Sequence, residues 1–299
     1  MRQKKPLQLK KCYDVAFSND SSLLVTLSRD VVGWDVGSRA KRFRVHPFSH
    51  PSSCAIDPSG AYIAAKNTMG QIIVVEAQEG ELVQVLDAEG ESEGSDICYS
   101  PCGEYLVDGS WTGFLTVRSV ATGDIVFQQH FVNEMITEAV RNASGDTWCF
   151  AHRPVAVDGR PPTRRDYISI WQWPLSAPAD VFTSPDSRMS SMALSPDGKR
   201  LCLLGDQVYV YSLPETELLA SSLVNGVSAG SEAAWSPSGE ELATVQRHSL
   251  VLHHPDTLET KQVIALDYAC SVAYSPDEAH LAVGGWSNGL LLERGMLGQ

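Results

Sequence analysis

The sequence predicts an all-β fold, a seven-bladed β-propeller with four-stranded antiparallel blades. Three observations lead to this prediction: one short turn motif recurs seven times, its copies are spaced by about one blade length, and apolar residues alternate around each copy. The seven copies are Ser18-Asn19-Asp20-Ser21, Asp57-Pro58-Ser59-Gly60, Ser100-Pro101-Cys102-Gly103, Asn142-Ala143-Ser144-Gly145, Ser195-Pro196-Asp197-Gly198, Ser236-Pro237-Ser238-Gly239 and Ser275-Pro276-Asp277-Glu278.

Each copy has the composition of a tight turn between two strands. Pro presets φ, a Ser or Asp side chain bonds the local backbone, and Gly tolerates a positive φ. The second position of the turn falls at residues 19, 58, 101, 143, 196, 237 and 276, so most copies are 39 to 43 residues apart. The exception is a spacing of 53 between Ala143 and Pro196. Because a propeller blade takes about 40 to 45 residues, each interval holds one blade.

The residues that flank each turn predict the first two strands of a blade. Small residues stand three positions before the second turn position: Ala16, Ala55, Cys98, Val140, Ala193, Ala234 and Ala273. One residue later the side chain is large and apolar or aromatic in six copies and Arg141 in the seventh. Such alternation places successive side chains on opposite faces of a strand. An apolar residue five positions after the same point, from Leu24 in the first copy to Leu281 in the last, marks the second strand.

The later part of each repeat predicts a third and a fourth strand. Alternating apolar pairs such as Ile72 and Val74 mark the third strand, and a fourth follows in most repeats. The seventh repeat has room for three strands only. Residues 6–10 carry the alternating Leu7 and Leu9 and are expected to add the missing outer strand. This addition would close the ring and protect both sheet edges, making residues 1–299 a single domain.

With these repeats the sequence resembles the WD-repeat family of β-propellers over nearly its full length. The closest agreement lies in Ser195-Pro196-Asp197-Gly198-Lys199-Arg200-Leu201 and in Gly109-Ser110-Trp111-Thr112-Gly113-Phe114-Leu115-Thr116-Val117. The Trp-Asp pair of the family survives only as Trp34-Asp35, and the Gly-His dipeptide that usually opens a repeat is missing. The resemblance therefore implies a divergent member in which the family's buried hydrogen-bond network is mostly absent.

Charge and cysteine usage exclude several classes of function. The 23 Lys and Arg against 36 Asp and Glu give a net charge of −13, which repels nucleic acids and anionic membranes. No span of about 18 apolar residues is present, and no signal-peptide segment follows the basic start. The seven cysteines include no CxxC pair, so we expect neither a disulfide framework nor a zinc site. A cytoplasmic protein without cofactors is expected.

Four acidic residues share one column, five positions before the second turn position. They are Asp14, Asp96, Glu138 and Glu232, and serines fill the other repeats. Because this column starts the innermost strand, the acids are expected to ring one mouth of the central channel. One interpretation is a cation site or acid–base chemistry by carboxylates with separated pKa values. The other is a set of small polar residues solvated in a wet channel. The column lacks the Asn or His ligands of metal-holding propeller hydrolases, so no catalytic or metal-binding residue is assigned.

A second candidate site lies on the face that carries the turns between second and third strands. Trp111 and Trp286 occupy equivalent turns of blades three and seven. The one large insertion, residues 151–166 in blade four, is expected to emerge on the same face. It carries the partner-binding candidates Arg153, Arg160, Arg164 and Arg165. Trp and Arg are enriched in binding hot spots. The alternatives are that each indole packs on its own blade and that the insertion is a tolerated surface loop.

Two classes of function therefore compete. A scaffold or adaptor that docks other proteins or protein complexes needs only a rigid disc with exposed anchors. An enzyme needs converging groups, and only the acidic column approaches that requirement. We expect a non-catalytic interaction scaffold, monomeric by itself, with a hydrolase or lyase centred on the acidic channel as the alternative.

Overall fold

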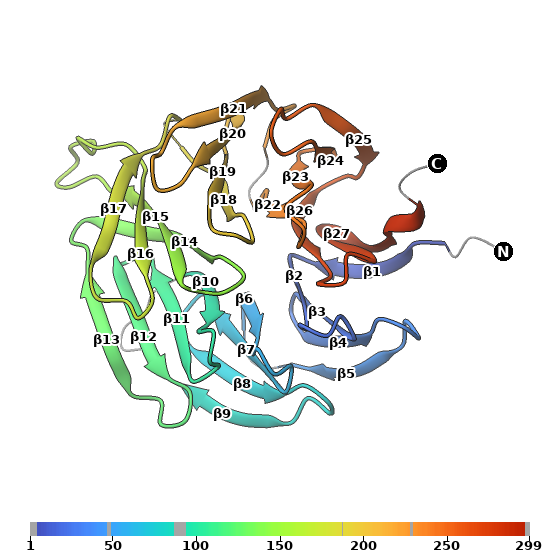
Figure 1. The fold of residues 1–299 in the computed structure, drawn as a ribbon. Coiled ribbons are helices and arrows are strands. Elements are labelled where there is room, and N and C mark those ends of the chain that lie inside the picture. The colour runs from blue at the N-terminus through green and yellow to red at the C-terminus, as the bar shows by residue number, and fades with distance from the viewer. Residues whose placement is uncertain (1–4, 47–48, 87–93, 187, 228–229, 297–299) are drawn as a thin grey trace.

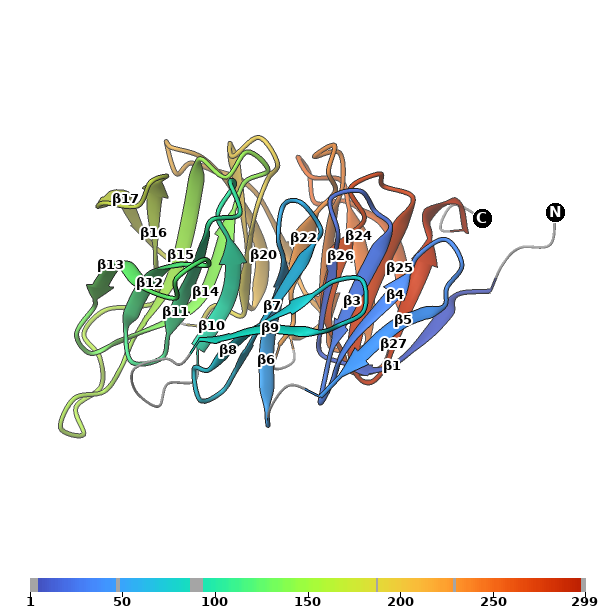
Figure 2. The same ribbon diagram turned by 90° about the horizontal axis from the view of Figure 1, so that it is seen from below.

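Seven antiparallel sheets stand around a central axis like the blades of a propeller, as Figure 1 shows. The computed structural model describes residues 5–46, 49–86, 94–186, 188–227 and 230–296. Figure 2 views the disc from its side and shows the turns gathered on two opposite faces. The predicted all-β, seven-bladed fold is confirmed.

Blades one to six each follow the order of the chain, from an innermost strand beside the axis to an outermost strand at the rim. Their strands are β2 (Asp14–Phe17), β3 (Leu23–Leu27), β4 (Val31–Asp35) and β5 (Lys41–Val45) in blade one; β6 (Pro51–Ile56), β7 (Tyr62–Asn67), β8 (Ile72–Glu76) and β9 (Leu82–Leu86) in blade two; β10 (Gly94–Tyr99), β11 (Tyr105–Ser110), β12 (Phe114–Ser119) and β13 (Ile125–His130) in blade three; β14 (Glu134–Arg141), β15 (Thr147–Pro154), β16 (Tyr167–Gln172) and β17 (Pro178–Thr183) in blade four; β18 (Ser191–Leu194), β19 (Arg200–Leu204), β20 (Gln207–Ser212) and β21 (Leu218–Leu223) in blade five; and β22 (Ala233–Trp235), β23 (Leu242–Gln246), β24 (Ser249–His253) and β25 (Thr260–Ala265) in blade six.

Blade seven combines segments from both ends of the described chain. Its innermost strand is β26 (Ala269–Tyr274), and β27 (His280–Glu293) supplies the two middle strands: residues 281–285 pair with β26 and residues 288–291 pair with β1 (Leu7–Cys12). Leu9 on β1 is buried in the core between blades seven and one. The N-terminal strand thus closes the last blade, as predicted. A short 3₁₀ helix, η1 (Arg294–Met296), follows β27.

The recurring turn is held by the same hydrogen bond in every blade. The side chain at its first position accepts a hydrogen bond of 2.7–3.2 Å from the backbone N–H five residues later. The seven donor–acceptor pairs are Leu23 to Ser18, Tyr62 to Asp57, Tyr105 to Ser100, Thr147 to Asn142, Arg200 to Ser195, Glu241 to Ser236 and His280 to Ser275. The fourth position has a positive φ in all seven turns, including the non-glycine residues Ser21 at 62° and Glu278 at 58°. The turn therefore has the same backbone geometry in every blade, whether or not its fourth residue is glycine.

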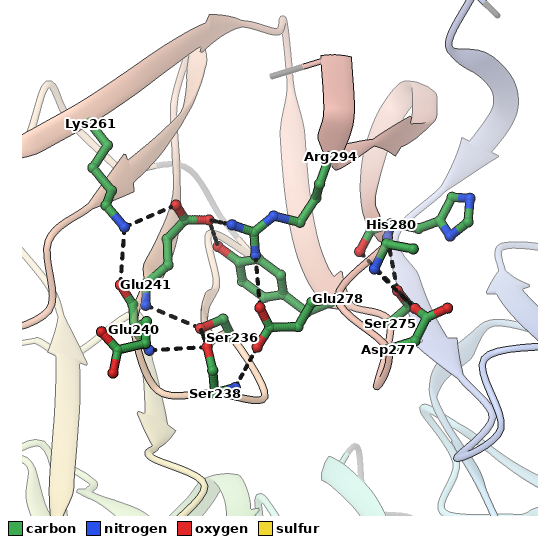
Figure 3. Close-up of polar contacts among 12 residues, drawn as sticks. Ser236, Ser238, Glu240, Glu241, Lys261, Ser275, Asp277, Glu278, His280 and Arg294 are labelled. Atoms are coloured by element: carbon green, nitrogen blue, oxygen red, sulfur yellow. Dashed lines mark hydrogen bonds and ion pairs between the residues drawn. The ribbon is translucent and has the colours of Figure 1, made fainter. Parts of the chain in front are cut away.

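A charged cluster fixes η1 to blades six and seven on the face of these turns (Figure 3). Glu241 accepts ion pairs from Lys261 at 3.3 Å and Arg294 at 2.9 Å, and a hydrogen bond from the Tyr274 hydroxyl at 2.9 Å. Arg294 also lies 3.6 Å from a carboxylate oxygen of Glu278. Three elements distant in sequence are thus joined around one buried carboxylate.

The insertion of blade four consists of a strand extension followed by a loop. Residues 151–154 continue β15, where they pair with β14, so the excursion between β15 and β16 covers residues 155–166. In Figure 2 this excursion projects beyond the disc at the lower left. Backbone hydrogen bonds between Val157 and Arg160 form a small turn within it.

Candidate functional site

The four acids of the shared column lie around one cavity on the propeller axis. Asp14 begins β2, Asp96 and Glu138 lie on β10 and β14, and Glu232 directly precedes β22. All four line a single cavity of about 600 Å³. Because every innermost strand runs in the same direction, the equal register of the four acids places them toward the same mouth of this channel.

Each of these carboxylates bonds to the backbone of the next blade. The Asp14 carboxylate accepts a hydrogen bond from the Cys54 N–H at 2.8 Å, and Asp96 accepts one from Ala139. Serines of the same column do the same: Ser53 accepts from Ile97 at 3.2 Å. The remaining bonds of this kind run from Met192 to Glu138 at 2.6 Å, from Ala233 to Ser191 at 3.4 Å and from Val272 to Glu232 at 3.1 Å. We call this column the axial ring. Its hydrogen bonds connect neighbouring blades at six of the seven blade boundaries.

Removal from water shifts the titration of the axial ring. Burial raises the pKa of Asp14 to about 6. Burial and then the charge of Asp14 raise the pKa of Asp96 to about 7. Burial, followed by repulsion from the neighbouring acids, holds the pKa of Glu138 and Glu232 well above the usual range. Part of the ring therefore keeps its protons near neutral pH.

The chemistry open to the axial ring is narrow. Its carboxylates already accept backbone hydrogen bonds, which orient them toward the neighbouring blade. Arg141 lines the same cavity and donates to the carbonyl of Asn142 at 3.2 Å. Across the described ranges of the chain, no three His, Cys, Asp or Glu side chains are grouped as metal ligands. The ring can hold protons and join blades, and the Cys54 and Cys98 thiols, whose pKa values are raised by burial, line the same cavity.

On the other candidate surface, Trp111 stands beside the insertion of blade four. Its side chain is 40% exposed in the turn between β11 and β12. This turn is bonded to the connection into blade four through the Phe131 N–H and the Gly113 carbonyl, at 2.8 Å. The insertion is bonded to the same connection through the Val155 N–H and the Asn133 carbonyl, at 2.9 Å. The structure therefore brings the Trp111 turn and the insertion to one place on the disc.

A hollow of about 470 Å³ lies between the insertion and the connection before β14. Val132, 66% exposed, and Val157, 42% exposed, line it together with the exposed Arg160 and Arg164. We call Trp111 and this hollow the blade-four surface. It combines exposed apolar area with positive charge, which are features of binding surfaces.

The four arginines of the insertion have different surroundings. Arg160, Arg164 and Arg165 are exposed. Arg153 instead pairs with Asp166 at 3.1 Å and donates to the Met189 carbonyl at 2.8 Å, which fastens the base of the insertion to the start of blade five. The predicted cluster is thus three exposed arginines and one that is engaged in the fold.

Trp286 lies in blade seven, separated from Trp111 by blades one and two. Its ring packs against Tyr13 with the centroids 5.4 Å apart and the planes inclined by 30°. The Lys11 ammonium lies 5.8 Å from the Trp286 ring. The side chain is still 43% exposed. The two tryptophans therefore share a face of the disc and belong to separate surfaces.

The sequence did not reveal a basic groove between blade seven and blade one. Five Lys and Arg side chains and one carboxylate line this groove of about 620 Å³: Lys10, Lys11, Arg29, Lys41, Arg44 and Asp30. These residues come from β1, the turn before β4, and β5, and the short basic stretches of the sequence do not show that they share one groove. His46 and His50 stand at the same groove.

The sequence also did not predict a buried arrangement of Ser169, His152 and Glu134 in blade four. The His152 Nε2 lies 2.7 Å from the Ser169 hydroxyl, and its Nδ1 lies 3.3 Å from the Glu134 carboxylate. The order is that of a catalytic triad. However, Ser169 and His152 are each 1% exposed, and the Ser169 oxygen accepts a hydrogen bond from Trp171 at 2.8 Å. A substrate therefore has no access to the hydroxyl, and the arrangement contributes to the packing of the blade.

Among the described residues, no helix has the length and apolarity needed to cross a membrane.

No family model matches the chain. The meiotic recombination protein rec14 of Schizosaccharomyces pombe is 32% identical over 116 residues, which cover 37% of this chain and 38% of rec14. The 77 kDa echinoderm microtubule-associated protein of Lytechinus variegatus is 28% identical over 92 residues, which cover 31% of this chain and 14% of that protein. The matched stretches therefore span much less than two thirds of either relative.

Proposed function

We propose that this protein is a non-catalytic scaffold of the WD-repeat type, which docks other proteins on the face that carries the turns between second and third strands. The observation that carries the proposal is the blade-four surface, where the half-exposed Trp111 stands beside a hollow lined by exposed valines and arginines. Large aromatic and Arg side chains supply most of the binding energy at protein interfaces. Apolar side chains that are exposed next to one another often mark an interaction site.

The blades themselves support the WD-repeat type. Trp34, in the one remaining Trp-Asp pair, donates its indole N–H to the Thr26 hydroxyl at 3.1 Å. His253 occupies the corresponding position of blade six and lies 2.9 Å from the Thr244 hydroxyl. Both side chains link the third strand of a blade to its second strand. The Trp-Asp pattern of the family is weak in this sequence, but the contact between the third and second strands is present in both blades.

The relatives support a role in binding macromolecules. One is named for meiotic recombination and the other for association with microtubules, which are protein polymers. Neither name identifies the partner of this chain. All seven cysteines are unpaired thiols, which supports a reducing compartment such as the cytoplasm.

The raised pKa values of the axial ring favour the alternative, a hydrolase or lyase centred in the channel, because shifted carboxyl groups are common in active sites. The backbone hydrogen bonds of the same carboxylates favour the scaffold. Glu138→Gln separates the two functions, since it keeps an acceptor for the Met192 N–H and removes an acid. Partner binding that survives this change supports the scaffold, and loss of a chemical activity with it supports the enzyme.

Affinity capture from the native host, with quantitative mass spectrometry, tests the docking face. The bait is the full chain, either unchanged or carrying Trp111→Ala or Arg164→Glu. Glu79→Ala is the matched control, because Glu79 is exposed on the β8–β9 turn of the opposite face. The scaffold proposal expects partners that the control retains and the two variants lose. Identical partner sets for all four baits would overturn the proposed face.

A further inference from the structure

The basic groove is walled by the outermost strands of two neighbouring blades, β1 of blade seven and β5 of blade one. β1 contributes Lys10 and Lys11 on one side, and β5 contributes Lys41 and Arg44 on the other. Arg29 stands at the end near the docking face, in the turn between β3 and β4. The groove therefore exists only in the closed ring, where the outermost strand of blade seven lies against blade one.

The charges in the groove are largely unneutralised. Among the described lining residues, Asp30 carries the one carboxylate, and Arg44 and His46 both pair with it. Within the part of the chain that the structure describes, Lys10, Lys11 and Lys41 pair with no carboxylate. The whole chain carries a net charge of −13, so this local excess of cations runs against the average field. Concentrated charge of one sign in a cleft focuses the field and attracts opposite charge.

Aromatic rings and hydroxyl groups give the groove more than charge. The Lys41 ammonium lies 5.0 Å from the Trp34 ring, and Lys11 lies near Trp286. The Tyr13 hydroxyl lies 2.7 Å from the carbonyls of Ser28 and Pro51, which fixes the inner end of the groove. The cations are thus held against flat apolar surfaces, on which the side chains of a bound segment can pack.

We infer that the basic groove binds an extended acidic segment of a partner protein, with its carboxylate side chains between the lysines of β1 and the Lys41 and Arg44 side chains of β5. This inference rests on the proposed docking function and assigns the class of partner to one of its surfaces. A volume of about 620 Å³ is of the size that holds a small ligand or a short stretch of peptide. A carboxylate between two ammonium groups gains charge-assisted hydrogen bonds on both sides.

The charge distribution favours a peptide over a nucleic acid. Duplex DNA carries one charge per about 1.7 Å of its axis, so its phosphates continue beyond the groove onto the acidic remainder of the disc. A peptide places its carboxylates at intervals and carries neutral residues between them. It can therefore satisfy the cations of the groove without being repelled by the rest of the surface.

Fluorescence anisotropy with the full chain tests the inference. The probe is a short labelled peptide in which glutamates alternate with serine and tyrosine, and its glutamine counterpart is the neutral comparison. The doubly substituted Lys10→Glu, Lys11→Glu protein should bind the acidic probe about tenfold more weakly. Lys41→Glu should also weaken binding, and higher salt should weaken binding to the unchanged protein.

The control reverses the same number of charges elsewhere. Arg160→Glu, Arg164→Glu alters the blade-four surface and should leave the affinity for the acidic probe within about twofold of the parent, since screening limits charge effects to about 10 Å. Equal weakening by both double variants, or equal affinity for the acidic and glutamine probes, would overturn the inference. Stronger competition by a single-stranded oligonucleotide than by the peptide would assign the groove to nucleic acid instead. A partner that needs Trp111 but not the groove lysines would leave the scaffold proposal standing and remove this one.

Discussion

The Lys66 ammonium lies 2.7 Å from the Asp108 carboxylate, buried across the boundary between blades two and three. It also donates to the Gly109 carbonyl at 2.8 Å, and its side chain is 1% exposed. Removing one partner of a buried pair leaves a charge without compensation.

Asp108→Asn should therefore lower the free energy of unfolding by about 3–5 kcal/mol. The exposed pair of His248 and Asp267 provides the control, and Asp267→Asn there should cost at most about 1 kcal/mol. Urea unfolding followed by tryptophan fluorescence measures both. Equal stability of the Asp108 and Asp267 variants would show that the buried pair contributes no more than a surface pair.

The axial ring should make stability depend on pH. An unfolded Asp ionises near pH 4, whereas folded Asp96 holds its proton up to a pKa of about 7. The folded state thus binds more protons between these values, and its stability falls as pH rises through that window. Asp96→Asn removes this group and can still accept the Ala139 N–H. Its melting temperature should exceed that of the parent by roughly 2–4 °C at pH 8, about 1 kcal/mol, and the gain should shrink toward pH 5. A gain independent of pH, measured by scanning fluorimetry, would contradict this assignment.

Gly145 should tolerate no side chain. Its φ is +70°, and an added Cβ would lie 2.3 Å from a side-chain carbon of Pro101 in the turn of the preceding blade. Gly145→Ala should cost about 2–4 kcal/mol, from backbone strain and overlap together. Gly159 has a φ of +73° with no atom within 4 Å, so Gly159→Ala isolates the backbone cost of about 1–2 kcal/mol. Similar losses of unfolding free energy for the two variants in urea would mean that the Gly145 turn and the Pro101 turn do not pack tightly against one another.

Loss of the N-terminal strand should open blade seven. Deleting residues 1–10 removes most of β1 and uncovers the edge of β27 and the core around Leu291. An uncovered edge pairs readily with other chains. The truncated protein should melt at a lower temperature and form larger species in size-exclusion chromatography with light scattering. A monomer with the parent's melting temperature would show that the ring does not need this strand.

Substitutions on the docking face should separate binding from stability. Trp111→Ala, and loss of Arg164 and Arg165, should each weaken partner binding by about 1–4 kcal/mol with little change in melting temperature. Trp286→Ala should lower the melting temperature as well, because the indole packs against Tyr13 and such ring pairs contribute about 0.5–1.5 kcal/mol. Calorimetric titration and scanning fluorimetry measure the two effects. Partner affinity unchanged by Trp111→Ala would move the interface elsewhere.

The repeat was predictable because the turn between the first two strands is formed by similar residues and by the same hydrogen bond in each blade. Ser18 and Ser275 show this, since each hydroxyl accepts the backbone N–H five residues on. The turn geometry persists at Ser21 and Glu278 without the glycine that the motif suggests, because contacts to neighbouring groups hold it: the Ser21 hydroxyl accepts the Asp277 N–H, and Glu278 accepts the Ser238 N–H. Glycine was thus a sufficient signal of the turn and not a necessary one.

The sites were less predictable because they depend on how blades meet. Asp14 and Glu138 occupy the same position of their repeats, so the sequence placed them at the same height of the channel. It did not indicate that each carboxylate accepts a hydrogen bond from a backbone N–H of the following blade. Arg153 has the same composition signal as Arg164, and only the fold shows that Asp166 engages it. The basic groove joins Lys10 to Lys41 across a blade boundary, and the sequence does not show that β1 and β5 face one another.

The pairing of β1 with β27 also sets an order for folding. Leu7 is synthesised before blades one to six, and its partner Leu291 is synthesised after them. During synthesis the first strand therefore waits without its sheet while six blades form from contacts local in the chain. Ring closure is the contact of greatest sequence separation, and such contacts slow folding. β1 thus stays unpaired while blades one to six are synthesised, and the basic groove does not exist until β1 has paired with β27.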